Sequence, residues 1–193
     1  MRIGFVVFDG MTTLDFLGVF DAVTRIRTMG FRDDLEWKVC GRGPEVRDGA
    51  GLILRVEEEG RGLEVYDMVV VPGGFSTREL EGDPGFVEWL RTAAGVEWKV
   101  SVCTGSLLLG AAGFLEGRAA TTHPSAFEAL GQYCREVRRE RIVEDGRVIT
   151  ARGVTSSLDL GLYLVERIAG AEVRERIRVQ MDYLSEEGDV YIA

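Results

Sequence analysis

The sequence predicts an α/β fold in which a doubly wound, mostly parallel sheet carries helices on both faces. Short continuous apolar runs at residues 2–8, 66–71 and 99–102 are typical of strands buried on both faces. Segments whose apolar residues follow helical spacing separate these runs. Because strands alternate with helices along the chain, we expect crossover connections and parallel neighbours.

In the first half of the chain, the first strand leads into a helix that starts at Thr12 and ends at Gly30. Thr12 and Asp15 have the spacing of a capping box, in which the acidic residue stands third in the helix. The other features expected in this half are strands at 35–40, 52–56 and 66–71, a turn-rich loop at 41–51 and a charged surface turn at 57–62.

The second half opens with a helix that begins at Asp83 and Pro84, because proline favours the first helical position. Asp145 and Gly146 mark the turn of a hairpin. The other features expected in this half are a strand at 99–102, helices at 107–112 and 125–132, the hairpin at 141–151, helices at 158–168 and 171–184, and a tail ending in residues 189–193.

Length and composition indicate one ordinary globular domain over residues 1–193, with 46% hydrophobic and 28% charged residues. The formal net charge of −9 argues against a nucleic-acid partner, because phosphate binding relies on clustered Lys and Arg. The basic run at 135–141 is interleaved with Glu136 and Glu140 and indicates a solvated face.

No stretch reaches the length of a membrane-spanning helix, so no membrane association is expected. The first residues indicate a strand and not a signal peptide. The three cysteines, Cys40, Cys103 and Cys134, are an odd number without metal-binding spacing. We therefore expect a cytoplasmic protein with reduced thiols and no metal site.

Cys103 stands at the centre of the most informative stretch, between an apolar strand and a helix rich in small residues. Thr104, Gly105 and Ser106 form the turn, an arrangement that parallels the nucleophile elbow of serine hydrolases. A helix N-terminus lowers the pKa of a nearby thiol, which favours a reactive thiolate. The alternative is an inert buried cysteine that serves as a small hydrophobe.

Two residues are candidate partners of this thiol. Asp15 is either a helix cap or a carboxylate facing Cys103, because loops after parallel strands converge at one edge of the sheet. His123, the single histidine, is either an ordinary residue before a helix or a base beside the thiolate.

The loop after residue 71 offers a candidate binding region. Gly73 and Gly74 allow backbone N–H groups to approach a ligand, as an oxyanion site requires, although the same residues also form plain turns. Phe16 directly follows Asp15 in the sequence and Phe75 directly follows Gly74, so both are expected near the proposed site. They suit an uncharged hydrophobic substrate or belong to the core.

Five segments carry a family resemblance: RIGFVVFDG, LDFLGVFDA, VVVPGGF, SVCTGSLLLGAAGFLEGRAATTHP and ITARGVTSSLDLGLYLV. The chain resembles the DJ-1/PfpI superfamily, whose fold is flavodoxin-like and related to class I glutamine amidotransferase domains. Within it, the second and fourth segments are most similar to isocyanide hydratases and to the sensor domains of AraC-type regulators. The chain ends soon after its last expected helix, so we expect no helix-turn-helix domain.

The resemblance implies roles for individual residues. Cys103 matches the elbow nucleophile, Asp15 matches the carboxylate that isocyanide hydratases place against it, and Thr104 matches the threonine after the nucleophile. Gly74 and the Thr104 N–H match the region of an oxyanion pocket. Deglycase-like members carry a glutamate where this chain has Asp15, and His123 is not a required residue in the hydratase pattern.

The resemblance also implies function and assembly. The leading hypothesis is a cofactor-free isocyanide hydratase-like enzyme, in which a small isocyanide becomes an N-substituted formamide through a thioimidate on Cys103, with Asp15 as general acid and base. The alternatives are glyoxalase or deglycase activity on small carbonyl compounds, and a stress protein whose Cys103 is oxidised to a sulfinic acid. A peptidase is least favoured, because its triad would depend on His123. A homodimer is expected from the resemblance alone.

Overall fold

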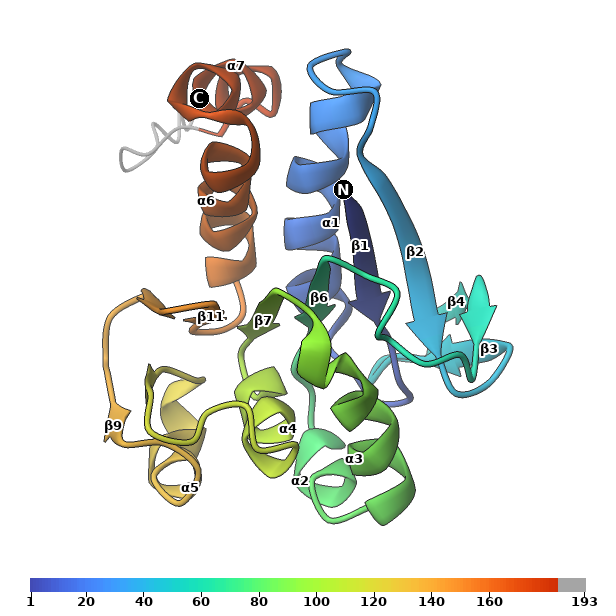
Figure 1. Cartoon of the computed structure of the whole chain (residues 1–193), viewed down its shortest axis with the longest axis vertical. Helices are drawn as coiled ribbons and strands as arrows, with labels where there is room; N and C mark the ends of the chain where they lie inside the picture. The colour runs from blue at the N-terminus through green and yellow to red at the C-terminus, as the bar shows by residue number, and fades with distance from the viewer. Residues whose placement is uncertain (184–193) are drawn as a thin grey trace, which may run out of the picture.

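The computed structural model describes residues 1–183, and a central sheet organises them (Figure 1). The strands are β1 (Arg2–Val6), β2 (Glu36–Gly41), β3 (Glu45–Arg47), β4 (Ile53–Arg55), β5 (Glu58–Glu59), β6 (Met68–Val71), β7 (Trp98–Val102), β8 (Ala119–Ala120), β9 (Glu136–Val137), β10 (Ile142–Asp145) and β11 (Val148–Ala151). The helices are α1 (Thr13–Thr28), α2 (Thr77–Leu80), α3 (Pro84–Arg91), α4 (Gly105–Ala111), α5 (Phe127–Leu130), α6 (Ser156–Ala169) and α7 (Ala171–Gln180), with 3₁₀ turns at Thr92–Gly95 and Pro124–Ala126.

The sheet has seven strands in the order β10-β11-β7-β6-β1-β2-β5. All neighbouring pairs are parallel except the β10–β11 hairpin. This arrangement confirms the predicted mostly parallel sheet, and its order places β7 between β6 and β11. The carboxyl ends of these three strands therefore lie side by side, where loops of an open α/β sheet form binding sites.

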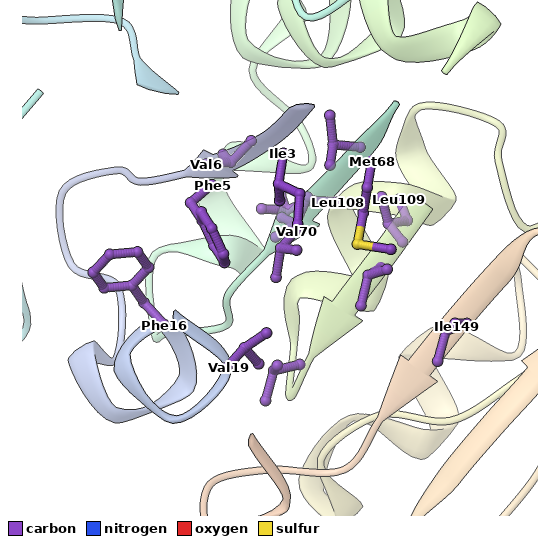
Figure 2. Packing of buried hydrophobic residues seen from close by; sticks show 14 of the residues in the cluster. Ile3, Phe5, Val6, Phe16, Val19, Met68, Val70, Leu108, Leu109 and Ile149 are labelled. Atoms are coloured by element: carbon purple, nitrogen blue, oxygen red, sulfur yellow. The ribbon is translucent and has the colours of Figure 1, made fainter. Parts of the chain in front are cut away.

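The core is built from the continuous apolar runs that predicted the central strands. Figure 2 shows Ile3 and Phe5 of β1 among other buried residues, with Phe16 of α1 beside Phe5. The two rings meet edge to face, with their centroids 5.8 Å apart. Helices α1 and α6 lie side by side, whereas α2, α3 and α4 form a separate group (Figure 1).

Several elements differ from the sequence-based expectations. The region expected as a loop at 41–51 contains β3, which pairs with β4, and the charged turn contains β5 at the sheet edge. The helix expected at 125–132 is a 3₁₀ turn followed by the one-turn α5, and α2 was not expected at all. Helix α7 ends at Gln180; Leu184 and the tail at 189–193 lie outside the described residues.

Local hydrogen bonds and a proline determine where helix α3 begins. Asp83 caps it by accepting hydrogen bonds from the N–H groups of Gly85 and Phe86, at 2.8 and 3.1 Å, and Pro84 occupies the first turn. This start was predicted from the sequence and is confirmed. Within residues 1–183, no helix is long and apolar enough to cross a membrane.

Candidate active site

Cys103 adopts a left-handed backbone conformation, with φ of 55°, directly after β7. Its N–H donates to the carbonyl of Ala151 at 2.9 Å. Its own carbonyl accepts from the hydroxyls of Ser106 and Thr122, at 3.2 and 3.0 Å. A non-glycine residue in this region is strained, so these three bonds hold the elbow that the sequence predicted.

Asp15 is fully buried and faces the same place from the start of α1. Its Oδ2 accepts from the Gly73 N–H at 3.1 Å, and its Oδ1 has no hydrogen-bond partner. Thr12 precedes the helix but makes no side-chain capping bond. The capping-box interpretation is therefore wrong, because the Asp15 carboxylate accepts a hydrogen bond from Gly73, 58 residues away, instead.

Gly73 is the point at which the candidate residues meet. A Cβ at this position would lie 2.6 Å from the Thr104 nitrogen, 2.7 Å from the Cys103 Cβ and 2.9 Å from Asp15 Oδ2. Such distances are too short for a side chain of any kind. Glycine is thus required here so that Asp15 and Cys103 can approach each other across the loop.

Burial governs the ionisation of both groups. It raises the pKa of Asp15 to about 7, although interactions with Cys103 and the Gly73 N–H oppose the rise. Burial and the negative charge of Asp15 raise the pKa of the Cys103 thiol to about 12, against the lowering effect of the Thr104 N–H. The helix start was expected to lower this pKa, but burial is the larger effect. The resting pair therefore holds its proton on sulfur.

Thr104 binds Gly74 through both of that residue's polar backbone groups. Its Oγ1 accepts from the Gly74 N–H and donates to the Gly74 carbonyl, each at 3.0 Å. The N–H groups of Gly73 and Gly74 are thus both engaged within the protein. In this conformation neither is a free donor for the oxyanion pocket that was expected from the sequence, whereas the Thr104 N–H, the other expected donor, interacts with the Cys103 side chain.

Gly153, which the sequence analysis did not single out, forms the other side of the thiol's surroundings. A Cβ there would lie 2.5 Å from the Cys103 Sγ. Gly153 follows β11, and β11 pairs in parallel with β7, with Ala151 opposite Val102. The rule that loops after neighbouring parallel strands converge would have identified it.

A cleft of about 140 Å³ leads to Cys103, whose side chain is otherwise buried. It is lined by residues from the loops that follow the parallel strands, from α2 and from the start of the 3₁₀ turn: Thr12, Gly74, Phe75, Arg78, Cys103, Thr104, His123, Ser125 and Val154. The volume lies below the range typical of sites for drug-sized ligands, so the cleft suits a small substrate.

The two candidate phenylalanines separate in the structure. Phe75 is 87% exposed and lines the cleft, as a substrate-contacting residue would. Phe16 is 4% exposed and packs against Phe5 and Phe20, so it belongs to the core and does not line the cleft. Its position on the inward face of α1 decides between the two interpretations that the sequence left open.

His123 lines the cleft without bonding to the thiol. Its Nδ1 accepts from the Ser125 N–H at 3.2 Å and lies 2.8 Å from the Ser125 Oγ. Among residues 1–183, it forms no hydrogen bond to Cys103 or Asp15. The side chain that faces the thiol is therefore a carboxyl group and not an imidazole.

Comparisons with known proteins agree with this architecture. Isonitrile hydratase of Pseudomonas putida is 32% identical over 184 residues, which cover 95% of this chain and 78% of that protein. The HTH-type transcriptional regulator CdhR of Pseudomonas aeruginosa is 27% identical over 91% of this chain and 53% of the regulator. The crystal structure of a ThiJ/PfpI family protein from Pseudomonas syringae has a TM-score of 0.87 at 27% identity, covering 96% of this chain and 76% of that one.

The family model described as DJ-1/PfpI family matches residues 1–167, a span that contains every residue of the cleft and of the thiol's surroundings. Because this match extends over most of the sequence and the solved structure shares the fold, the chain belongs to the DJ-1/PfpI family.

Proposed function

We propose that this protein is a cofactor-free hydratase that converts small isocyanides into N-substituted formamides. The observation that carries the proposal is the buried pair of Asp15 and Cys103 at the base of a small cleft. A carboxyl group with a pKa of about 7 both accepts and returns a proton near neutral pH, which this hydration requires. The similarity to isonitrile hydratase of Pseudomonas putida supports the same chemistry.

In the first step, the Cys103 sulfur attacks the terminal carbon of the isocyanide while Asp15 accepts the thiol proton. A carbon–sulfur bond forms, and the electron pair left on that carbon takes the proton back from Asp15. The product is a thioimidate in which the former isocyanide carbon bears one hydrogen. Asp15 is again a carboxylate, ready for the second step.

In the second step, Asp15 assists a water molecule that attacks the thioimidate carbon. The nitrogen takes up one of the water protons, and the carbon–sulfur bond then breaks. The sulfur leaves with the other water proton, so the free thiol is restored and the N-substituted formamide is released. The overall change is the addition of one water to one isocyanide.

The backbone donors distinguish this reaction from acyl transfer. Hydrolysis of a peptide or ester builds negative charge on oxygen and needs free N–H groups aimed at it. Here the N–H groups of Gly73 and Gly74 are engaged by Asp15 and Thr104, which leaves the Thr104 N–H beside the Cys103 side chain as a single donor. An isocyanide instead develops charge on carbon and nitrogen, which Asp15 and water neutralise by proton transfer.

The test is steady-state formamide production from an alkyl isocyanide. Wild type should turn over, and Cys103→Ala and Asp15→Asn should each abolish turnover. Cys134→Ala is the matched control, because Cys134 is a free thiol outside the cleft. Absence of turnover by folded wild type would refute the proposal. Methylglyoxal turnover would then support carbonyl chemistry, and ready oxidation of Cys103 would support a redox role.

We also propose that the protein is a homodimer located in the cytoplasm. Leu14 and Leu17 are exposed on one face of α1, which supports an interface there. The three free thiols support a reducing compartment. Light scattering should give twice the chain mass for wild type and a monomer for the double variant Leu14→Glu, Leu17→Glu. Val179→Glu, an exposed apolar residue on α7, is the control. A monomeric wild type would contradict the proposal.

A further inference from the structure

Arg78 gives the cleft a cationic side chain that the hydration mechanism does not use. It lies on α2, lines the cleft and is exposed. Its Nη2 donates to the Ser125 Oγ at 3.3 Å, a contact between residues 47 apart in the sequence. The guanidinium group therefore joins two segments that line the cleft.

Ser125 connects Arg78 to His123. His123 Nδ1 accepts from the Ser125 N–H at 3.2 Å and lies 2.8 Å from the Ser125 Oγ, the same oxygen that accepts from Arg78 Nη2. The three side chains therefore hold one another in place.

Most of the donors of Arg78 remain available. A guanidinium group has five N–H donors in a planar fork that matches a carboxylate. Within residues 1–183, Arg78 has no carboxylate within 4 Å and one hydrogen bond, to Ser125. A cationic fork at the cleft without an acidic partner in the described part of the chain is suited to bind an anionic ligand.

The other residues that line the cleft also favour an anionic ligand. It contains no acidic residue, and Asp15 lies buried next to the thiol with one oxygen bonded to Gly73. The chain as a whole carries a formal charge of −9. Because the net charge of the protein is negative, Arg78 does not attract anions over a long distance. It acts at short range, on a ligand that has entered the cleft.

We propose that the cleft takes a small substrate with a carboxylate close to its reactive carbon, and that Arg78 binds this carboxylate. For the hydration reaction, this means an isocyanocarboxylate, held with its carboxylate on Arg78 and its terminal carbon at Cys103. The identity of the reactive group rests on the proposed function. Recognition of the carboxylate does not, and it can be measured separately.

The first experiment compares two isocyanides of nearly equal size, isocyanoacetate and isobutyl isocyanide. Wild type should favour isocyanoacetate in kcat/KM, and Arg78→Met should reduce kcat/KM for isocyanoacetate roughly tenfold or more, mainly through KM. The value of kcat/KM for isobutyl isocyanide should fall much less, so the preference of the enzyme for isocyanoacetate should shrink. Arg55→Met is the matched control, because Arg55 is exposed, lies outside the cleft lining and has no salt bridge within residues 1–183.

The second experiment does not depend on hydratase activity. Iodoacetate and iodoacetamide alkylate thiols by the same displacement and differ mainly in charge, so peptide mass spectrometry can compare their rates at Cys103. Arg78→Met should lower the ratio of the iodoacetate rate to the iodoacetamide rate by about tenfold, and Arg55→Met should leave it unchanged. Arg78→Lys keeps the charge without the fork and should give an intermediate ratio.

The outcomes separate the two proposals. If wild type hydrates neither isocyanide but the alkylation ratio falls in Arg78→Met, the proposed function fails and carboxylate recognition stands. If Arg78→Met retains both the substrate preference and the alkylation ratio of wild type, carboxylate recognition by Arg78 is refuted, whether or not isocyanides are hydrated.

Discussion

Gly153 lies so close to Cys103 that a methyl group on its α-carbon would stand 2.5 Å from the sulfur. The space around the thiol therefore depends on the absence of a side chain at Gly153, in the loop after β11, as much as on the side chains that are present.

Gly153→Ala should therefore reduce hydration strongly, by about a hundredfold, because the added methyl displaces the nucleophile from its position. Gly95→Ala is the control, since a Cβ at Gly95 would meet nothing within 4 Å and would leave the site untouched. The measurement is kcat/KM together with thermal unfolding of both variants. A fully active Gly153→Ala enzyme would show that the sulfur position is not critical.

Asp15→Asn should change two properties of Cys103 in opposite directions. Removing the carboxylate removes a negative charge that raises the pKa of the thiol, so alkylation by iodoacetamide at mildly alkaline pH should become about tenfold faster. Hydration should become about a hundredfold slower or worse, because the proton carrier is gone. Loss of both alkylation and hydration would indicate instead that Asp15 holds the site together.

The rate of hydration should depend on pH through Asp15. Its pKa of about 7 means that the carboxylate, the form that accepts the thiol proton, is lost as the pH falls below neutrality. The value of kcat/KM should therefore rise between about pH 5 and pH 8 and then level off, because the thiol keeps its proton to a far higher pH. Asp15→Asn should lack the rise through neutral pH. A flat wild-type profile would contradict the assigned role.

Thr104→Val should destabilise the protein by about 1–3 kcal/mol, because it leaves the buried Gly74 N–H without its partner, whereas the Gly74 carbonyl still accepts from the Thr77 hydroxyl at 2.7 Å. Thr104→Ser retains the hydroxyl and should stay close to wild type. Urea unfolding of both variants measures the difference. Equal stabilities would mean that water or a shifted loop replaces the threonine hydroxyl.

The strands and the elbow could be predicted because each depends on local patterns. Residues 100–102 form a buried run, and the turn residues that follow leave little alternative to a strand, a sharp turn and a helix. Helix α2 could not be predicted, since its four residues are too few to show helical spacing.

The site required information that local patterns do not contain. The spacing of Thr12 and Asp15 is the same for a cap and for an active-site carboxylate, and the contact with Gly73 decides between them. Likewise, a helix start suggested a lower pKa for Cys103, but burial, which is set by the whole fold, raises it. Phe16 was ambiguous until its packing against Phe5 was known.

The three hydrogen bonds that fix the elbow are all made by the peptide groups of residue 103 and none by its sulfur. The backbone conformation at residue 103 therefore does not depend on which reactive atom the side chain carries. A serine or selenocysteine at this position would therefore occupy the same place. The reactivity of the nucleophile can thus be changed by substitution while its position is kept.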